Sequence, residues 1–381
     1  MNSNSITEVC RKIAEQYTEK LILCSDPLRP LWNRESVLFR KPPRWNYIDS
    51  CMISAVLKLY DLTEGKKLAD YAVRFTDAYL LPDGTIPTMS PDDFNLDNLC
   101  GGRNLIRLWK LTGEERFRLG YERLYTGQVL RQPRLTCGSF WHKAIYPHQI
   151  WLDGAYMALP FVAEYGLITG DRTVVADALR QFDNIRRLMC DPDTGLYRHG
   201  YDETRTQLWA DRTSGLSPEF WLRSMGWLCA GLVDTAELLP DSQLCRSMLC
   251  GLLDSAGKYV RDGMLYQLPV RPELEGNYPE TSGTLLFAYA ALKATRLGLA
   301  DKAALGFELL GNTAERYIRT DGEVPVLENI CLMGGLGGEN SRDGSAGYYL
   351  REPVVENDAK GIAPFLMAYT EAERITGTHL R

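Results

Sequence analysis

Apolar residues recur every three to four positions along most of the chain, which is the spacing of amphipathic helices. No segment shows a convincing alternation of apolar and polar residues, so we expect no sheet in the core. Gly, Pro, Asn and Asp interrupt the helical pattern at intervals. The pattern predicts helices at residues 6–24, 48–62, 66–80, 96–111, 114–130, 155–168, 172–189, 220–238, 242–260, 281–296, 300–318 and 359–375.

The connections between these helices alternate in length. Short turns such as LYDLTEG and EYGLITGD alternate with long loops at residues 81–95, 131–154, 190–219, 261–280 and 320–358. Short turns join antiparallel neighbours, whereas long loops without structure of their own commonly carry function. A helix pair that recurs every roughly 50 to 80 residues indicates a repeat architecture, which overrides the two or three domains suggested by length alone.

The last helix, residues 359–375, has no partner unless the N-terminal helix within residues 1–25 supplies it. Closing the ring in this way gives an all-α fold, an (α/α)6 toroid of six hairpins, as a single domain over residues 1–381. An open solenoid is the alternative, because stacked helical pairs need only neighbour contacts. In a closed ring the long loops share one end and feed the inner helices, so distant residues meet at one mouth.

Tryptophan is concentrated in these long loops and at the helix starts that follow them. Its flat face and single N–H suit the C–H faces of a sugar ring, although such rings can also simply pack loops onto the rim. Together with the nearby carboxylates and one Arg, they favour a cleft of carbohydrate size. The tryptophans concerned are Trp32, Trp45, Trp141, Trp151, Trp209, Trp221 and Trp227.

The stretch HQIWLDGAYMALP, residues 148–160, holds a lone carboxylate, Asp153, between Trp151 and Gly154. One interpretation is that Asp153 caps the helix predicted at residues 155–168, because Asp satisfies free N–H groups at helix starts well. The other is that an apolar pocket raises the pKa of Asp153, which then holds a proton and acts as a general acid. The stretch alone leaves both interpretations open.

Charge and composition exclude several classes of function. The net charge is −6 without a basic run, so the electrostatic footprint of a nucleic-acid-binding protein is missing. No apolar run reaches transmembrane length, and the N-terminus lacks a signal-peptide core, so no membrane partner is expected. The ten cysteines are scattered without a CxxC pair, which is typical of free thiols in the cytoplasm.

No motif indicates a metal or another cofactor. His142 and His148 are six residues apart, which does not match the spacing of helix-borne metal ligands. The glycine-rich run LMGGLGGEN opens no helix after a strand, so it does not predict a phosphate site. His199, in LYRHGYD, lies in a long loop that can reach the mouth, either as a substrate contact or as a hydrogen-bonding residue of the loop.

Five motifs follow one another along the chain: HQIWLDGAYMALPF, TGLYRHGYDE, SPEFWLRSMGWLCAGLVD, PETSGTLLFAYAAL and YYLREPVVENDAKGIAPFLMAY. In this order and spacing they resemble glycoside hydrolase family 105, the unsaturated rhamnogalacturonyl hydrolases, over roughly residues 45 to 369. The resemblance implies a six-hairpin toroid and an oligosaccharide substrate. It implies an enzyme that removes a 4,5-unsaturated uronic acid from the non-reducing end of fragments that pectin lyases or similar lyases leave, such as rhamnogalacturonan fragments.

The resemblance also implies roles for individual residues. Asp153 is the expected catalytic acid and base, and Asp97 its companion. The pocket for the sugar is expected from His199, Trp221, Arg223 and Trp227, to which the mouth adds Trp45, Tyr47, His148 and Trp151. The sequence departs from the family pattern within WLRSMGW, where Leu222, Ser224 and Met225 replace small residues and an Asn.

The implied reaction protonates C4 of the C4=C5 enol ether, and water then adds at C5. Asp153 must begin protonated, and both the like charge of Asp97 and the apolar ring of Trp151 are expected to raise its pKa. Arg223 is expected to hold the substrate carboxylate through a two-pronged contact. The alternatives are an unsaturated glucuronyl hydrolase, a sugar-binding toroid without activity, and a sugar 2-epimerase, for which four histidines are few.

Overall fold

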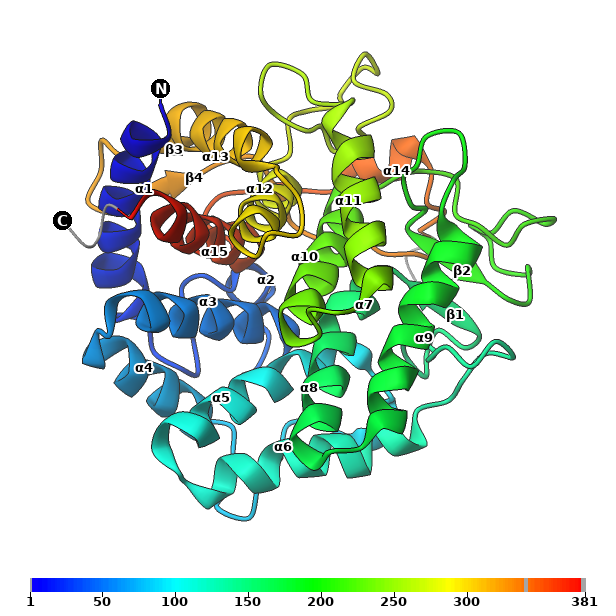
Figure 1. Cartoon of the computed structure of the whole chain (residues 1–381), viewed down its shortest axis with the longest axis horizontal. Coiled ribbons are helices and arrows are strands. Elements are labelled where there is room, and N and C mark those ends of the chain that lie inside the picture. Colours follow the sequence, from blue (N-terminus) through cyan, green and yellow to red (C-terminus); the bar gives the residue numbers. More distant parts are fainter. Residues whose placement is uncertain (1, 339–341, 378–381) are drawn as a thin grey trace.

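Twelve of the helices form two concentric rings in the computed structural model, which describes residues 2–338 and 342–377 (Figure 1). Each outer helix pairs with the inner helix next to it in the chain, except α1, which pairs with the last inner helix. The outer helices are α1 (Ser3–Tyr17), α4 (Lys66–Asp77), α6 (Glu115–Gly127), α9 (Arg172–Met189), α11 (Gln243–Gly257) and α13 (Ala303–Tyr317). The inner helices are α3 (Tyr47–Thr63), α5 (Gly102–Thr112), α8 (Leu159–Thr169), α10 (Leu222–Leu238), α12 (Thr281–Arg296) and α15 (Ala359–Thr376).

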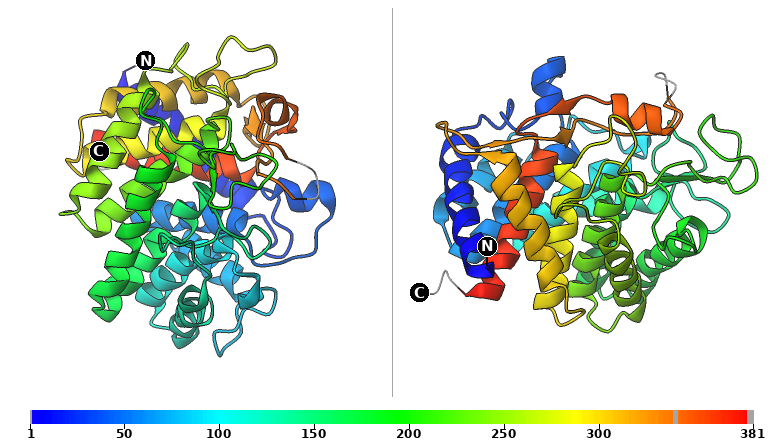
Figure 2. Two further views of the ribbon diagram at one scale, coloured as in Figure 1. Left: turned by 90° about the vertical axis from the view of Figure 1, so that its right-hand side faces the viewer. Right: turned by 90° about the horizontal axis from the view of Figure 1, so that it is seen from above.

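The ring is closed by contacts between the two ends of the chain. Helix α15 packs against α12, the preceding inner helix, and also against α3, the first inner helix. Helix α1 lies outside α15 and α13 (Figures 1 and 2). The toroid predicted from the helix periodicity is therefore confirmed, and the open solenoid is wrong.

The two rings differ in burial in the way their sequences predict. Almost every residue of α10 and α12 is buried, because these helices contact neighbours on all sides. Helix α4 buries only one stripe, which contains Leu68, Tyr71 and Phe75, and exposes the rest. An all-round apolar helix must lie inside a protein, whereas a one-sided helix covers its surface.

Several helix boundaries differ from the predicted ones. Residues 172–189 and 281–296 are helical as predicted, but residues 96–111 begin as a 3-10 helix at Leu96–Gly101. The helix predicted at residues 155–168 is broken into α7 (Asp153–Met157) and α8. Pro160 lies in the first turn of α8, and because it has no N–H it cannot continue the hydrogen-bond ladder of α7.

The connections between the helices contain short elements that the periodicity did not predict. They include the six-residue helices α2 (Arg34–Phe39) and α14 (Ala346–Arg351). They also include three antiparallel pairs of strands: β1 (Gln149–Trp151) with β2 (Gly200–Asp202), β3 (Ile318–Arg319) with β4 (Val326–Leu327), and β5 (Ile330–Cys331) with β6 (Val354–Val355). Strands of two or three residues are too short to show an alternating pattern.

All ten cysteines are free thiols, as the sequence predicted. Over the described ranges 2–338 and 342–377, none of the helices is both long enough and apolar enough to cross a bilayer.

Gly101 provides a test of the packing beneath the mouth. A Cβ atom at Gly101 would lie 2.1 Å from Cζ2 of Trp45, so we expect Gly101→Ala to destabilise the fold by about 1–3 kcal/mol through overpacking. Gly251 is the matched control, because it lies within α11 and a Cβ there meets nothing within 4 Å. We expect Gly251→Ala to stabilise the fold by about 0.5–1 kcal/mol. Urea unfolding measures both changes, and equal effects would contradict this packing.

Candidate active site

The short β1–β2 ladder brings two distant motifs together at the mouth of the ring. Its register pairs Gln149 with Asp202 and Trp151 with Gly200. The pairing continues one residue further, where the N–H of Leu152 donates to the carbonyl oxygen of His199 over 3.0 Å. This ladder places Asp153, at the start of α7, beside the side chain of His199.

Asp153 and His199 form the centre of the candidate site. Nε2 of His199 lies 3.1 Å from Oδ2 of Asp153, and Nδ1 lies 2.6 Å from the hydroxyl oxygen of Tyr349 in α14. The N-cap of α7 is Leu152, which makes no side-chain capping hydrogen bond, and Asp153 is the first residue within the helix. Asp153 therefore does not cap the helix, and the capping interpretation is wrong.

Aromatic rings enclose this pair. The ring of His199 lies 5.5 Å from Trp151, edge-on, and 4.8 Å from Trp221, and Trp221 stacks on Tyr349 at 5.7 Å. The side chain of His199 has no exposed surface, whereas 16% of the Asp153 side chain is exposed. The carboxyl group of Asp153 is therefore the part of the pair that a ligand in the mouth can reach.

The pKa of Asp153 is lowered, which contradicts the rise expected from the sequence. Burial alone raises the pKa of Asp153, but the hydrogen bond to His199 and, in the acidic range where the carboxyl group titrates, the charges of His199 and His142 outweigh it. The expectation was wrong because it considered Trp151 and Asp97 and did not include the imidazole in contact with the carboxylate. Nε2 of His199 is nevertheless close enough to the carboxylate for a proton to pass between the two groups.

Asp97 does not act on Asp153 as an unbalanced like charge. Oδ2 of Asp97 lies 2.6 Å from Nζ of Lys143, and its Oδ1 lies 3.8 Å from Nε2 of His142. Burial lowers the pKa of His142 to about 4, so this ring is neutral at pH 7. His142 also stacks on Trp151 at 4.6 Å, which links the Asp97 side of the mouth to the Asp153 side.

The contacts of Lys143 with Asp97 and of Tyr349 with His199 were not predicted from the sequence. Lys143 directly follows His142 in the long loop that leads to Asp153, and a positively charged residue in that loop could have indicated a partner for a carboxylate at the mouth. Tyr349 lies within the motif YYLREPVVEND that carried the family resemblance, but it stood in a loop without periodicity.

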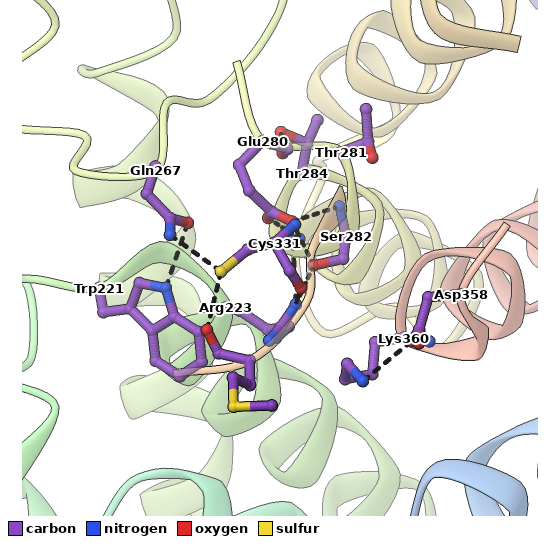
Figure 3. A network of polar contacts seen from close by, with 12 residues as sticks. Trp221, Arg223, Gln267, Glu280, Thr281, Ser282, Thr284, Cys331, Asp358 and Lys360 are labelled. Carbon is purple, nitrogen blue, oxygen red and sulfur yellow. Dashed lines mark hydrogen bonds and ion pairs between the residues drawn. The ribbon is translucent and has the colours of Figure 1, made fainter. Parts of the chain in front are cut away.

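Arg223 lies deeper than a ligand-binding group was expected to lie. Its side chain is 2% exposed, and Nη1 donates to the carbonyl oxygen of Cys331 and to Oγ of Ser282. Glu280 lies 4.0 Å away, and the ring of Trp221 lies 4.9 Å from the guanidinium carbon. Figure 3 shows Trp221 and Arg223 side by side, with Gln267 holding the indole N–H of Trp221.

The rest of the WLRSMGW segment lies in the core. Trp227 is 1% exposed and stacks on Tyr156 with 4.8 Å between ring centroids. It is also the sixth residue of α10, and so lies deeper in the helix than the first turn assigned from the sequence. Leu222, Ser224 and Met225 have no exposed surface, so these departures from the family pattern contact the core and not the mouth.

Trp45 and Tyr47 line a second part of the mouth. They border a cavity of about 270 Å³ together with Asp97 and Lys143. The indole N–H of Trp45 donates to the carbonyl oxygen of Asn98 over 2.8 Å, which fixes the ring against the start of the next inner helix. Both residues therefore lie at the mouth, where the sequence analysis expected them, on the side of Asp97.

His148 lies outside this arrangement. Its side chain is 44% exposed, its ring rests against Trp141 at 4.5 Å, and Glu203 lies 3.8 Å from Nδ1. It borders neither the Asp153–His199 pair nor the cavity beside Asp97. Among the residues that the structure describes, no three His, Cys, Asp or Glu side chains are grouped so that they could hold a metal ion.

Comparisons with known proteins agree with the fold. The family model for Glycosyl Hydrolase Family 88 matches residues 29–376. The solved structure of a family 105 glycoside hydrolase from C. acetobutylicum is 32% identical, with a TM-score of 0.86, covering 97% of this chain and 99% of that one.

Two relatives are similar over part of the chain. Protein Atu3128 of Agrobacterium fabrum is 44% identical over 57% of this chain and 98% of its own length. The unsaturated rhamnogalacturonyl hydrolase YesR of Bacillus subtilis is 24% identical over 66% of this chain and 72% of its own.

Proposed function

We propose that this chain, which belongs to the unsaturated uronyl hydrolases of glycoside hydrolase families 88 and 105, acts on rhamnogalacturonan fragments. It removes the 4,5-unsaturated galacturonyl residue that a pectin lyase leaves at their non-reducing end. The observation that carries this proposal is the contact between Asp153 and His199 inside an aromatic enclosure. A similar chain of 24% identity, YesR, bears the name of this activity.

The reaction begins with transfer of a proton from the carboxyl group of Asp153 to C4 of the substrate. The π electrons of the C4=C5 bond form the new C4–H bond, so C4 and C5 remain joined by a single bond. Positive charge develops at C5 and on the ring oxygen. The Asp153 carboxylate takes a proton from a water molecule, whose oxygen bonds to C5. The hemiketal opens, the ring oxygen becomes a hydroxyl on C1, and the hemiacetal there releases the rest of the oligosaccharide. One carboxyl serves as acid and then as base.

The proton for this step comes from the Asp153–His199 pair. In the free enzyme Asp153 is ionised at neutral pH, because its pKa is lowered, and the proton must reach it through the hydrogen bond to His199. Transfer along the 3.1 Å hydrogen bond gives a neutral carboxyl and a neutral imidazole, whose Nδ1–H donates to Tyr349. Two titrating groups this close share their proton, so the pair acts as one acid.

Other side chains position the pair. Trp151 and Trp221 exclude water from His199, and we propose that the stacked indoles also face the sugar ring. Arg223 is almost fully buried, so we assign it to holding Trp221 and Glu280 in place rather than to the substrate carboxylate. Asp97, held by Lys143, is assigned to hydrogen bonds with sugar hydroxyls in the 270 Å³ cavity.

Two substrates of the same size separate this proposal from its nearest rival. We expect unsaturated galacturonyl-rhamnose to lose its ultraviolet absorbance in the presence of the enzyme faster than an unsaturated chondroitin disaccharide does. The opposite preference would assign the chain to unsaturated glucuronyl hydrolases of the glycosaminoglycan type. The Asp153→Asn protein with each substrate serves as the blank.

Replacing Tyr349 by Phe tests the hydrogen bond that orients His199. Removal of the hydroxyl leaves Nδ1 without its partner at 2.6 Å, so we expect kcat to fall by roughly tenfold, the cost of about 1.4 kcal/mol. KM is expected to change little because Tyr349 is fully buried. Tyr348→Phe is a control from the same turn of α14. Equal losses in both variants would contradict a role through His199.

We place the enzyme in the cytoplasm. Its ten free cysteines, of which Cys10, Cys51, Cys100, Cys229, Cys245 and Cys331 are buried, fit a reducing compartment. Fractionation of the native host tests this placement, and recovery of the activity outside the cell membrane would contradict it.

A further inference from the structure

A loop and short helix, residues 28–44, lie over the edge of the mouth and are called the strap here. It contains α2, which stands out from the rings in Figure 2. The strap is anchored from beneath. The indole N–H of Trp32 donates to Oδ1 of Asp49 over 3.1 Å, and Glu35 lies 3.0 Å from Nζ of the buried Lys360 in α15. These buried contacts hold it in a fixed place above the starts of α3 and α15.

The strap covers a cavity of about 550 Å³, which is the larger neighbour of the cavity beside Asp97. Ser36, Lys41, Arg44 and Asn46 line both cavities. Because they share these four residues, the two cavities adjoin, with Asp97 and Lys143 at one end and the strap over the other. Together they are called the groove here. Neither Asp153 nor His199 lines these cavities, but Nε2 of His142 lies 3.8 Å from Oδ1 of Asp97, and the His142 ring stacks on Trp151. The groove therefore begins beside the Asp153–His199 pair and is placed to hold the sugars that follow an unsaturated end bound there.

The outer part of the groove is positively charged in a protein whose net charge is −6. Arg29, Arg40, Lys41 and Arg44 line the larger cavity. Lys41 is balanced by Glu35 at 2.9 Å. The side chains of the three arginines form no ion pair or hydrogen bond with any of the residues 2–338 and 342–377. Among the residues that the structure describes, Asp49 has the only carboxylate that lines this cavity, and its oxygens are held by Trp32, Asn33 and Asn46.

Unpaired arginines that converge on one cavity are suited to a carboxylate, because the planar guanidinium matches its two oxygens. The chemistry of the substrate supplies such a group. A lyase can leave a C4=C5 bond only by eliminating at a uronic acid, so the polymer it cuts holds uronic acids at intervals. A fragment longer than one repeat therefore carries a further carboxylate beyond its unsaturated end.

We propose that the groove under the strap binds the carboxylate of a second acidic sugar in the leaving oligosaccharide, through Arg40 and Arg44. This inference rests on the proposed function, since it requires that the unsaturated end lie at Asp153. It makes the enzyme selective for fragments of at least three sugars whose leaving part is itself anionic. A neutral leaving sugar ends before it reaches these arginines.

The experiment compares two substrates and two double variants. The substrates are the unsaturated galacturonyl-rhamnose disaccharide and the tetrasaccharide in which this unit is followed by galacturonyl-rhamnose. The test variant is Arg40→Gln with Arg44→Gln. The control is Lys66→Gln with Arg172→Gln, which removes the same charge from the starts of α4 and α9, at the opposite end of the rings.

We expect the test variant to lose at least about tenfold in kcat/KM on the tetrasaccharide, mainly through KM, and less than about twofold on the disaccharide. The control variant is expected to keep both rates, and added salt to weaken only the tetrasaccharide reaction of the wild type. Equal losses on both substrates, or no loss on the tetrasaccharide, would overturn the inference while the proposed function stands. If the wild-type protein turns over neither substrate, the proposed function itself fails.

Discussion

Asp153→Asn is expected to lower turnover of the unsaturated disaccharide by at least ~10²-fold, the usual contribution of a general acid–base group. The amide cannot give a proton to C4 or take one from water. It has the shape of the carboxyl group and can still accept a hydrogen bond from Nε2 of His199, 3.1 Å away. Substrate affinity and the free energy of unfolding are therefore expected to stay close to the wild-type values.

The measurement is loss of the ultraviolet absorbance of the conjugated C4=C5 acid under saturating substrate. Asp301→Asn is the matched control, because Asp301 is exposed in the turn before α13, at the end of the rings opposite the mouth. A variant at Asp153 that retained near-normal kcat would remove this residue from the chemistry.

His199→Gln is expected to move the alkaline limb of the pH–rate profile to lower pH. In this mechanism the limb marks loss of the proton that reaches Asp153 through His199. Without the imidazole only the carboxyl group of Asp153 can hold that proton. Carboxyl groups hold a proton less tightly than imidazoles do, and burial, which raises the pKa of Asp153, offsets this difference only in part. At neutral pH we expect kcat/KM to fall roughly 10- to 100-fold.

The sign of this shift follows from the state of the pair. The pKa of Asp153 is held low by His199, so at neutral pH Asp153 is ionised and receives its proton only through the hydrogen bond to His199. His148→Gln is the control for loss of a histidine, because His148 lies half-exposed outside the site. An unchanged alkaline limb in His199→Gln, with only kcat reduced, would show that His199 does not hold the catalytic proton.

The ring architecture could be predicted from the sequence because it depends on periodicity over long segments. Helices of 16 or 18 residues, such as α12 and α9, repeat their apolar stripe several times. The alternation of short and long connections then fixed which helix ends share the mouth. Breaks within a helix escaped this reasoning, since the local effect of Pro160 is confined to one turn.

The site could be predicted only in part, because its contacts are set by elements too short to leave a pattern. The motifs identified Asp153 and His199, but the three-residue strands β1 and β2 bring them together. The expected rise in the pKa of Asp153 failed for that reason. The sign of a pKa shift depends on the nearest charged partner, and spacing along the chain did not reveal that contact.

The partners of the charged side chains were the least predictable part of the site. Lys143 compensates Asp97, and Ser282 and Cys331 hold Arg223, across separations of 46 to 108 residues in the sequence. A lone carboxylate or guanidinium in a sequence gives its chemistry but not its neighbour. Arg223 was therefore predicted to bind the carboxylate of the substrate, although its side chain is buried in the protein.

The central claim is that the enzyme adds water across the C4=C5 bond and that release of the leaving sugar follows from this step. It is tested most directly by recording, in one reaction with the unsaturated disaccharide, both the loss of ultraviolet absorbance and the appearance of free rhamnose. We expect absorbance to disappear at least as fast as rhamnose appears, from the first turnover onward. Rhamnose that appears while the absorbance persists would mean direct cleavage at the anomeric carbon and would contradict the claim.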